Sequence, residues 1–154
     1  MTKFFLLAFG ISSTLTAAAV AEDLAIVVGK SSPVSEVSSA ALRKIFRCEK
    51  TKASDGSKLT VVVRSGGLEH GTALAAIYKT DVMGYNKYFL HATFTGTVAA
   101  APRALSTGRS VKAFVAETPG GIGYVKASDI DDNVKALKVD GKAPGEAGYP
   151  LHLK

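Results

Sequence analysis

The chain contains 154 residues, 47% of them hydrophobic, and carries a formal net charge of +6 at pH 7. This length fits one domain with a core of its own. The basic residues are spread along the chain and form no stripe between stacking aromatic residues, which argues against nucleic-acid binding and leaves a mild preference for anionic ligands. The single cysteine, Cys48, excludes an internal disulfide, and we expect it to be a small, half-buried residue.

Residues 1–21 have the features of a secretory signal peptide. Lys3 gives a positively charged start, residues 4–11 are apolar, and residues 19–21 (Ala-Val-Ala) form a small-x-small cleavage site. The apolar stretch is too short to span a bilayer, which argues against an uncleaved membrane anchor. We therefore predict an exported, periplasmic protein whose mature domain is residues 22–154.

The first predicted strand is the apolar run at residues 24–28. A Gly-Lys-Ser-Ser-Pro sequence ends it, so Ser31 and Ser32 lie just beyond its carboxyl end, where open α/β sheets bind ligands. These two hydroxyls are candidate ligand contacts, and an ordinary serine turn is an equally good interpretation. A helix capped by one of two consecutive serines follows and ends at Phe46, with its apolar face directed to the core.

The central stretch of the domain is residues 59–79. Residues 59–63 predict a buried strand, residues 64–71 a loop with three glycines, and residues 72–79 a helix. The free N–H groups at a helix N-terminus favour an anion, glycines let the backbone approach it closely, and the Arg64 guanidinium suits two oxygens of one oxyanion. The loop contains neither the Gly-Lys-Ser/Thr nor the GxGxxG phosphate motif. It therefore indicates either an oxyanion site or a plain turn.

The second half of the domain continues the alternation of helices and strands. Residues 93–109 are expected to form a long polar connection, residues 111–117 a helix, and residues 122–125 and 133–139 strands. Before them, an aromatic stripe at helical spacing predicts the core-facing side of a helix: Tyr85, Tyr88, Phe89 and Ala92. The alternation of predicted strands and helices along the chain indicates an α/β domain with a mixed, mainly parallel sheet flanked by helices.

The sequence carries no pattern typical of catalysis, metal binding or cofactor binding. The histidines at positions 70, 91 and 152 are scattered and do not combine with carboxylates or cysteines at metal-ligand spacing. The sequence has no Gly-x-Ser-x-Gly elbow and no defensible order of serine, histidine and aspartate. We therefore predict that the protein is not an enzyme and uses no metal or cofactor.

Several motifs resemble those of the phosphate-type periplasmic substrate-binding proteins of ABC transporters. Residues 41–46 (ALRKIF) resemble the ELRxIF helix of that family, and residues 114–125 (FVAETPGGIGYV) are similar to its V…TPGAIGYV segment, which is the most specific match. Residues 64–72 (RSGGLEHGT) resemble its R…SGT ligand loop, with His70 in the place of a serine, and residues 149–151 match its YPL. The motifs keep the family order and cover nearly the whole mature chain.

The resemblance implies a single-lobe version of this fold that binds phosphate or a similar oxyanion, because the segment between residues 94 and 109 is too short for a second lobe. It also implies a set of ligand residues: Arg64, Ser65, Gly66, Gly67, His70, Gly71 and Thr72 from the central stretch, closed by Ser31 and Ser32 from the first strand. The implied partners are the small anion, a membrane component of an ABC transporter, and a second protomer that replaces the missing lobe. The alternative is a protein-interaction or sensor module that kept the fold and lost the ligand.

Overall fold

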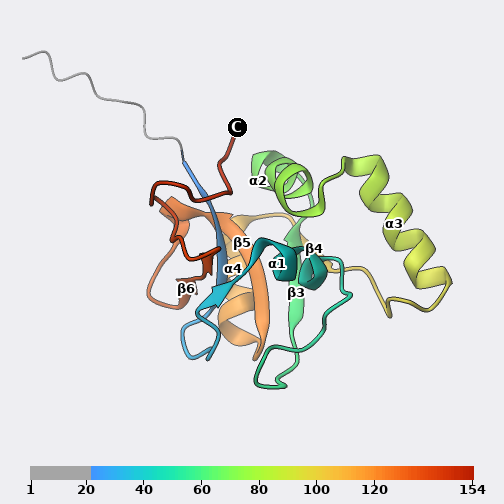
Figure 1. The fold of residues 1–154 in the computed structure, drawn as a ribbon, viewed down its shortest axis with the longest axis horizontal. Helices are drawn as coiled ribbons and strands as arrows, with labels where there is room; N and C mark the ends of the chain where they lie inside the picture. Colours follow the sequence, from blue (N-terminus) through green and yellow to red (C-terminus); the bar gives the residue numbers. More distant parts are fainter. Residues whose placement is uncertain (1–21) are drawn as a thin grey trace, which may run out of the picture.

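The computed structural model describes residues 22–154, so the predicted signal peptide lies outside the described residues. Strands and helices alternate along most of this part of the chain (Figure 1). The predictions of a strand at residues 24–28, a helix that ends at Phe46, and a strand at residues 122–125 are confirmed. In chain order the elements are β1 (Leu24–Gly29), β2 (Glu36–Val37), α1 (Ser39–Phe46), β3 (Thr60–Arg64), α2 (Gly67–Ala73), the π-helical turn η1 (Leu74–Tyr78), α3 (Val82–Phe94), β4 (Arg103–Leu105), α4 (Gly108–Glu117), β5 (Gly121–Lys126), the 3-10 turn η2 (Ala127–Asp129), β6 (Val134–Ala136) and β7 (Lys138–Val139).

A mixed sheet of five strands, in the order β4-β3-β5-β1-β6, forms the centre of the described domain, and β2 pairs with β7 apart from it. Within residues 22–154, β1 alone runs against the other four strands of this sheet, because it is antiparallel to β5 and β6 while β3 is parallel to β4 and β5. The predicted mixed, mainly parallel sheet is therefore confirmed. The register places Ile122 beside both Val28 and Val61, so β1 ends where β3 begins.

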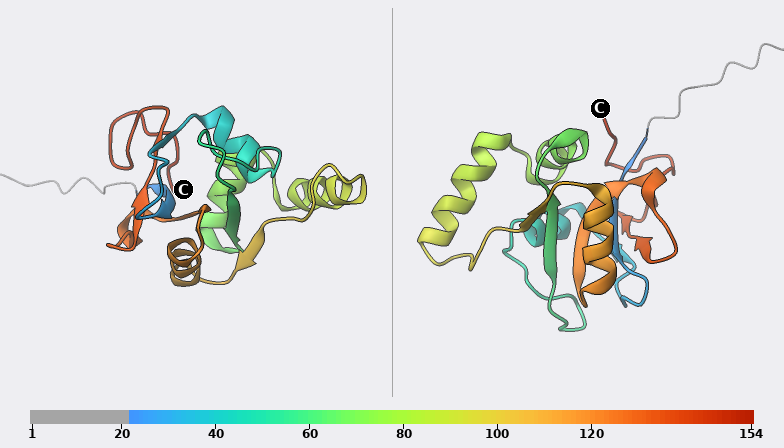
Figure 2. Two further views of the ribbon diagram at one scale, coloured as in Figure 1. Left: turned by 90° about the horizontal axis from the view of Figure 1, so that it is seen from below. Right: turned by 180° about the vertical axis from the view of Figure 1, so that it is seen from behind.

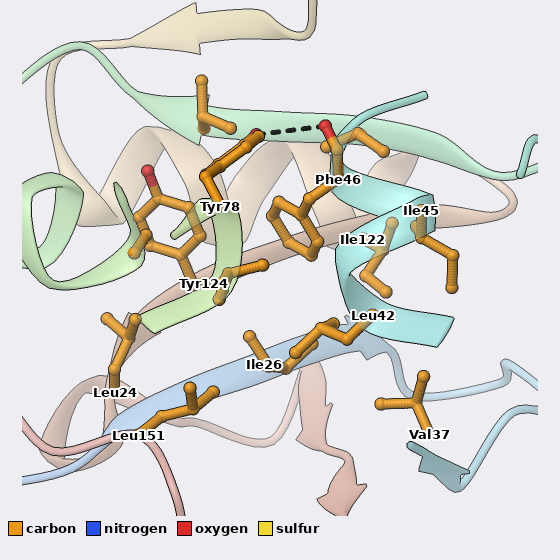
Figure 3. Packing of buried hydrophobic residues seen from close by; sticks show 14 of the residues in the cluster. Leu24, Ile26, Val37, Leu42, Ile45, Phe46, Tyr78, Ile122, Tyr124 and Leu151 are labelled. Carbon is orange, nitrogen blue, oxygen red and sulfur yellow. Dashed lines mark hydrogen bonds between the residues drawn. The ribbon is translucent and has the colours of Figure 1, made fainter. Parts of the chain in front are cut away.

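Helices cover both faces of the sheet. Side chains alternate along each strand, so that Val27 of β1 packs on the α4 side and Ile26 on the α1 side. Figure 1 shows α1 in front of the sheet, and the view from behind in Figure 2 shows α4 on the opposite face. On the α1 side, the rings of Phe46, Tyr78 and Tyr124 pack together, and the Tyr78 hydroxyl donates to the Phe46 carbonyl at 3.1 Å (Figure 3). This aromatic cluster anchors the segment that follows β3.

The helix after β3 begins earlier than the sequence pattern predicts. Its first residue is Gly67, whereas the prediction placed the start at Thr72. Glycine has a weak helix propensity, so the pattern indicates a loop at this point. A φ of 85° at Gly67, which glycine allows at little cost, turns the chain from β3 into the helix, and Ala73 and Leu74, buried in the core, hold the segment in place.

Two predicted segments are divided differently in the structure. The connection predicted at residues 93–109 contains the edge strand β4, which pairs with β3 in parallel. Its residues are mostly exposed and lack a strand's apolar pattern, so the sequence does not reveal it. The strand predicted at residues 133–139 splits into β6 and β7, because the chain leaves the edge of β1 at Leu137 and then joins β2.

Helix α3 stands at one side of the molecule, away from the sheet, in the views of Figures 1 and 2. Asp81 caps it, with Oδ1 accepting the Gly84 N–H at 2.8 Å. Phe89 and Ala92 are buried on its inner side, which confirms that the predicted aromatic stripe belongs to the core. In the part of the chain that the structure describes, no helix combines the length and the apolar character needed to cross a membrane.

Candidate functional site

A cavity of about 400 Å³ opens where β3 ends and α2 begins. The remaining walls come from Leu74, from α3 and from Ala104 of β4. The chain turns from β3 into α2 within a few residues, so side chains that are neighbours in sequence meet around one space. Six of the predicted ligand residues line this cavity: Arg64, Ser65, Gly66, Gly67, His70 and Gly71.

Thr72 lies away from this cavity. It is buried inside α2, with 9% of its surface exposed, and it lines a separate cavity of about 670 Å³ together with Lys79 and His152. The predicted start of this helix near Thr72 is therefore corrected, because the first turn of α2 starts at Gly67.

Ser31 and Ser32 lie at the other end of the sheet. They line a cavity of about 270 Å³ with Leu59 and Gly120, next to the start of β3. Because β1 is antiparallel to β5, its carboxyl end lies beside the amino end of β3 and far from Arg64. The structure thus does not bring these serines to the Arg64 cavity, contrary to the expectation that they close it. That expectation assumed a first strand parallel to its neighbours, whose carboxyl ends share one edge.

The Arg64 guanidinium is paired inside the protein. Its Nη1 lies 2.9 Å from Oε1 of Glu69, and the two side chains are only 17% and 8% exposed. A Cβ on Gly67 would lie 3.3 Å from Nη2 of Arg64 and 3.3 Å from Oε2 of Glu69, so a glycine at this position lets the loop pass close to the ion pair. The pair reduces the net positive charge of the cavity wall, and an anion would share Arg64 with Glu69.

Glu69 is a residue of this site that sequence reasoning does not identify. It lies five positions after Arg64, within a segment that reads as a glycine-rich loop. Its place in the first turn of α2, where the helix dipole stabilises a negative charge, becomes visible only once the true start of the helix is known. The available signal was a single acidic residue among the glycines of residues 64–72.

His70 and Tyr124 form a second polar pair at the cavity. Nδ1 of His70 lies 2.8 Å from the Tyr124 hydroxyl, and that hydroxyl accepts the backbone N–H of Arg64 at 3.2 Å. The hydroxyl can therefore donate its own proton to Nδ1, which leaves the ring proton on Nε2. Burial lowers the pKa of His70, and the positive charge of Arg64 lowers this pKa further. The lowered pKa favours the neutral imidazole, and when Nδ1 accepts from Tyr124 the N–H donor of the ring lies on Nε2.

Cys48 is half-buried, as predicted, and lies apart from the cavity. Burial raises the pKa of its thiol to about 11, so the thiol stays protonated at neutral pH and is a poor nucleophile. Within residues 22–154, no three histidine, cysteine, aspartate or glutamate side chains gather as metal ligands would.

Comparison with protein-family models and with curated proteins gives no match, but solved structures do match. A putative phosphate ABC transporter substrate-binding protein with bound phosphate from Clostridium perfringens aligns with a TM-score of 0.63 and 19% identity over 79% of this chain and 47% of its own. PstS from Borrelia burgdorferi aligns with a TM-score of 0.65 and 16% identity over 88% of this chain and 56% of its own. An ABC-type phosphate transport receptor from Vibrio cholerae aligns with a TM-score of 0.61 and 20% identity over 86% of this chain and 55% of its own. The chain has the substrate-binding-protein fold.

The substrate-binding-protein fold occurs here in a short chain. This chain spans about half the length of the solved structures that it matches, at 47%, 55% and 56% of their residues. The fold class predicted from the sequence is confirmed by these alignments together with the observed mixed sheet.

Proposed function

We propose that this protein is an exported solute-binding protein that holds phosphate or a similar oxyanion in the Arg64 cavity and catalyses no reaction. The observation that carries the proposal is the convergence of six predicted ligand residues on one cavity of about 400 Å³. A water molecule takes about 30 Å³ of liquid, so this space has room for a tetrahedral oxyanion and several waters. The structural neighbours are also named as binding proteins and transport receptors.

The lining residues would bind the anion through hydrogen bonds more than through net charge. Glu69 already neutralises part of the Arg64 charge at 2.9 Å. The remaining donors are the Ser65 hydroxyl, the backbone N–H groups of the loop glycines and Nε2–H of His70, together with Nη2 of Arg64. Each such hydrogen bond contributes about 0.5–1.5 kcal/mol, and somewhat more when it involves a charged group. The donor set therefore suits a compact oxyanion with several acceptor oxygens.

Export to the periplasm and a role in ABC transport are part of the same proposal. They are supported by the signal-peptide pattern of residues 1–21 and by the printed names of two neighbours, an ABC transporter substrate-binding protein and an ABC-type transport receptor. The membrane component of such a transporter would be the partner that receives the solute.

Thermal unfolding and titration calorimetry of residues 22–154 test anion binding directly. Phosphate, sulfate and chloride are compared at equal ionic strength. We expect phosphate to raise Tm, because a ligand at 100 times its Kd adds about 2.7 kcal/mol to the free energy of unfolding. A folded protein whose Tm and heat of mixing are the same in all three anions would overturn the proposal and favour the ligand-free interaction module.

A further inference from the structure

The outer side of α3 is apolar and exposed. Met83, Leu90 and Phe94 are 79%, 74% and 91% exposed. Their spacing of seven and four residues places them, with Lys87 between them, on one side of the helix. Phe89 lies about a third of a turn away and is buried against the body of the protein. We call Met83, Lys87, Leu90 and Phe94 the outer α3 face.

A helix on the surface of a monomer usually has one apolar stripe and one polar side. α3 departs from this pattern because it is apolar on its inner side and on the outer α3 face as well. A phenylalanine buries on the order of 200 Å² when it is fully covered, so the outer α3 face exposes on the order of 500 Å². That area lies near the upper end of the range for the largest apolar patch on a typical monomer, and larger exposed patches mark contact surfaces.

We propose that the outer α3 face is a self-association surface on which α3 of a second copy packs antiparallel about a twofold axis. Its residues follow one another at intervals of four, three and four, so the pattern reads the same in both directions. A twofold axis at the middle of the helix therefore sets Met83 against Phe94 of the second copy and Lys87 against Leu90 of the second copy. The first contact joins a thioether to an aromatic ring, and the second lets the lysine stem cover a leucine while its ammonium group reaches water.

The composition of the outer α3 face favours a second copy over an anionic membrane or an acidic protein. Lys87 is its single formal charge at pH 7, so a negatively charged partner would gain little from it. Another outer α3 face offers the same apolar side chains at matching positions. Two such faces would bury on the order of 1,000 Å² in total, which is near the lower limit for a specific protein contact. The dimer is therefore weak and reversible.

The position of α3 links this contact to the Arg64 cavity. Val82, Tyr85 and Asn86 of α3 line that cavity, and Val82 is 58% exposed at its rim. A second copy packed along α3 would lie beside the cavity and add to its wall. This step rests on the proposed function, and it predicts that anion binding and association strengthen each other.

Sedimentation velocity of residues 22–154 between about 10 and 500 μM tests the contact. We expect a dimer that forms with rising concentration and that Leu90→Lys weakens at least about tenfold, because the change sets a second lysine at the centre of the contact. Leu90 is 74% exposed, so the variant should keep its Tm. Leu68→Lys is the matched control, because Leu68 is 49% exposed on α2, outside the outer α3 face. A protein that is monomeric throughout this range, or equal weakening by both variants, would overturn the proposal.

Two further measurements test whether the outer α3 face binds a membrane instead of a second copy, and whether self-association depends on anion binding. In co-sedimentation with phosphatidylglycerol vesicles, we expect the outer α3 face to make no contribution to binding. If a monomeric protein binds the vesicles and Leu90→Lys abolishes that binding, the outer α3 face is a membrane contact instead. With about 5 mM phosphate, the dimer should tighten at least threefold, and Ser65→Ala, which weakens anion binding, should reduce this gain. A basal dimer that phosphate does not tighten, in a protein that does not bind phosphate, would contradict the proposed function and leave the contact standing.

Discussion

The two ends of the five-stranded sheet look similar in sequence and differ in structure. At one end β3 finishes with Arg64 and is followed by Ser65, and at the other end Ser31 and Ser32 follow β1, next to cavities of about 400 and 270 Å³ respectively. Only the β3 end, within the described residues, combines a helix start, an arginine and a histidine. At the β1 end Lys135 Nζ donates to the Ser32 carbonyl at 2.6 Å, and no arginine, histidine or helix start among residues 22–154 lines the cavity. A polar turn at a strand end thus becomes a candidate anion site when a helix start and suitable side-chain donors meet there.

Removing the cation at the β3 end should have the largest effect. Arg64→Ala leaves the Glu69 carboxylate, whose side chain is 8% exposed, without its partner. Breaking a buried ion pair costs about 3–5 kcal/mol, and we expect a loss near the lower value in urea unfolding because Arg64 is partly exposed. Anion affinity should fall by about 1.5–3 kcal/mol in calorimetry. Lys135→Ala at the β1 end is the control that should leave anion affinity unchanged. An intact affinity in folded Arg64→Ala protein would place the anion elsewhere.

Removing the negative charge that shares Arg64 should act in the opposite direction. Glu69→Gln keeps an oxygen that can accept from Arg64 Nη1, at a position now 2.9 Å away, and loses the charge beside the bound anion. Two like charges a few Å apart in a partly solvated site repel by about 1–4 kcal/mol, so we expect phosphate and sulfate to bind at least about fivefold more tightly. Calorimetry at fixed ionic strength measures the change. Weaker binding would show that the main role of Glu69 is to position Arg64.

Serine-to-alanine substitutions give the most direct comparison of the β3 end and the β1 end of the sheet. Ser65→Ala should lower anion affinity by about 0.5–1.5 kcal/mol, the usual contribution of one hydrogen bond. Ser31→Ala and Ser32→Ala should leave the affinity unchanged, because both residues line the other cavity. Titrations of the three variants with phosphate give the result, and a loss of affinity in either β1-end variant would reverse the assignment of the site.

His70 should give the smallest effect, and one that depends on pH. Burial and Arg64 lower its pKa in the free protein, and a bound anion would raise this pKa again. Affinity for sulfate, which keeps its charge near neutral pH, should be strongest below the free-state pKa and fall as pH rises through the bound-state pKa. Titrations between about pH 5 and 8 cover this range. His91→Gln on α3 is the control that should keep the profile, whereas a flat profile in the parent protein would place His70 outside contact with the anion.

The same histidine predicts how stability depends on pH without ligand. Since the pKa of His70 is lower in the folded protein than in the unfolded chain, the unfolded chain binds the proton first as pH falls. His70 therefore contributes its full stability above about pH 6.5, and this contribution is lost progressively below that value. Urea unfolding of the parent protein and of His70→Gln should converge toward lower pH, and parallel curves would contradict the lowered pKa.

The sequence predicted which residues gather at the candidate site better than it predicted the interactions that they make there. Arg64, Ser65 and His70 come from one strand–turn–helix segment, so neighbours along the chain are neighbours in space, and apolar patterning is enough to find them. The ion pair with Glu69 was not predicted, because the weak helix propensity of glycine makes the first turn of α2 resemble a loop in the sequence. The hydrogen bond from Tyr124 joins residues 54 positions apart, and nothing local in the sequence encodes that contact.

By itself, the sequence determined the strands and helices with strong apolar periods, the serine cap of α1, and the grouping of residues 64–71 around one turn, because these depend on contacts within a few residues. The tertiary structure decided the direction of β1, which separates Ser31 and Ser32 from Arg64. It also decided that α3 exposes an apolar side. The direction of β1 and the exposure of α3 depend on which strands pair and which helix faces become buried, and these are determined by contacts between distant parts of the chain.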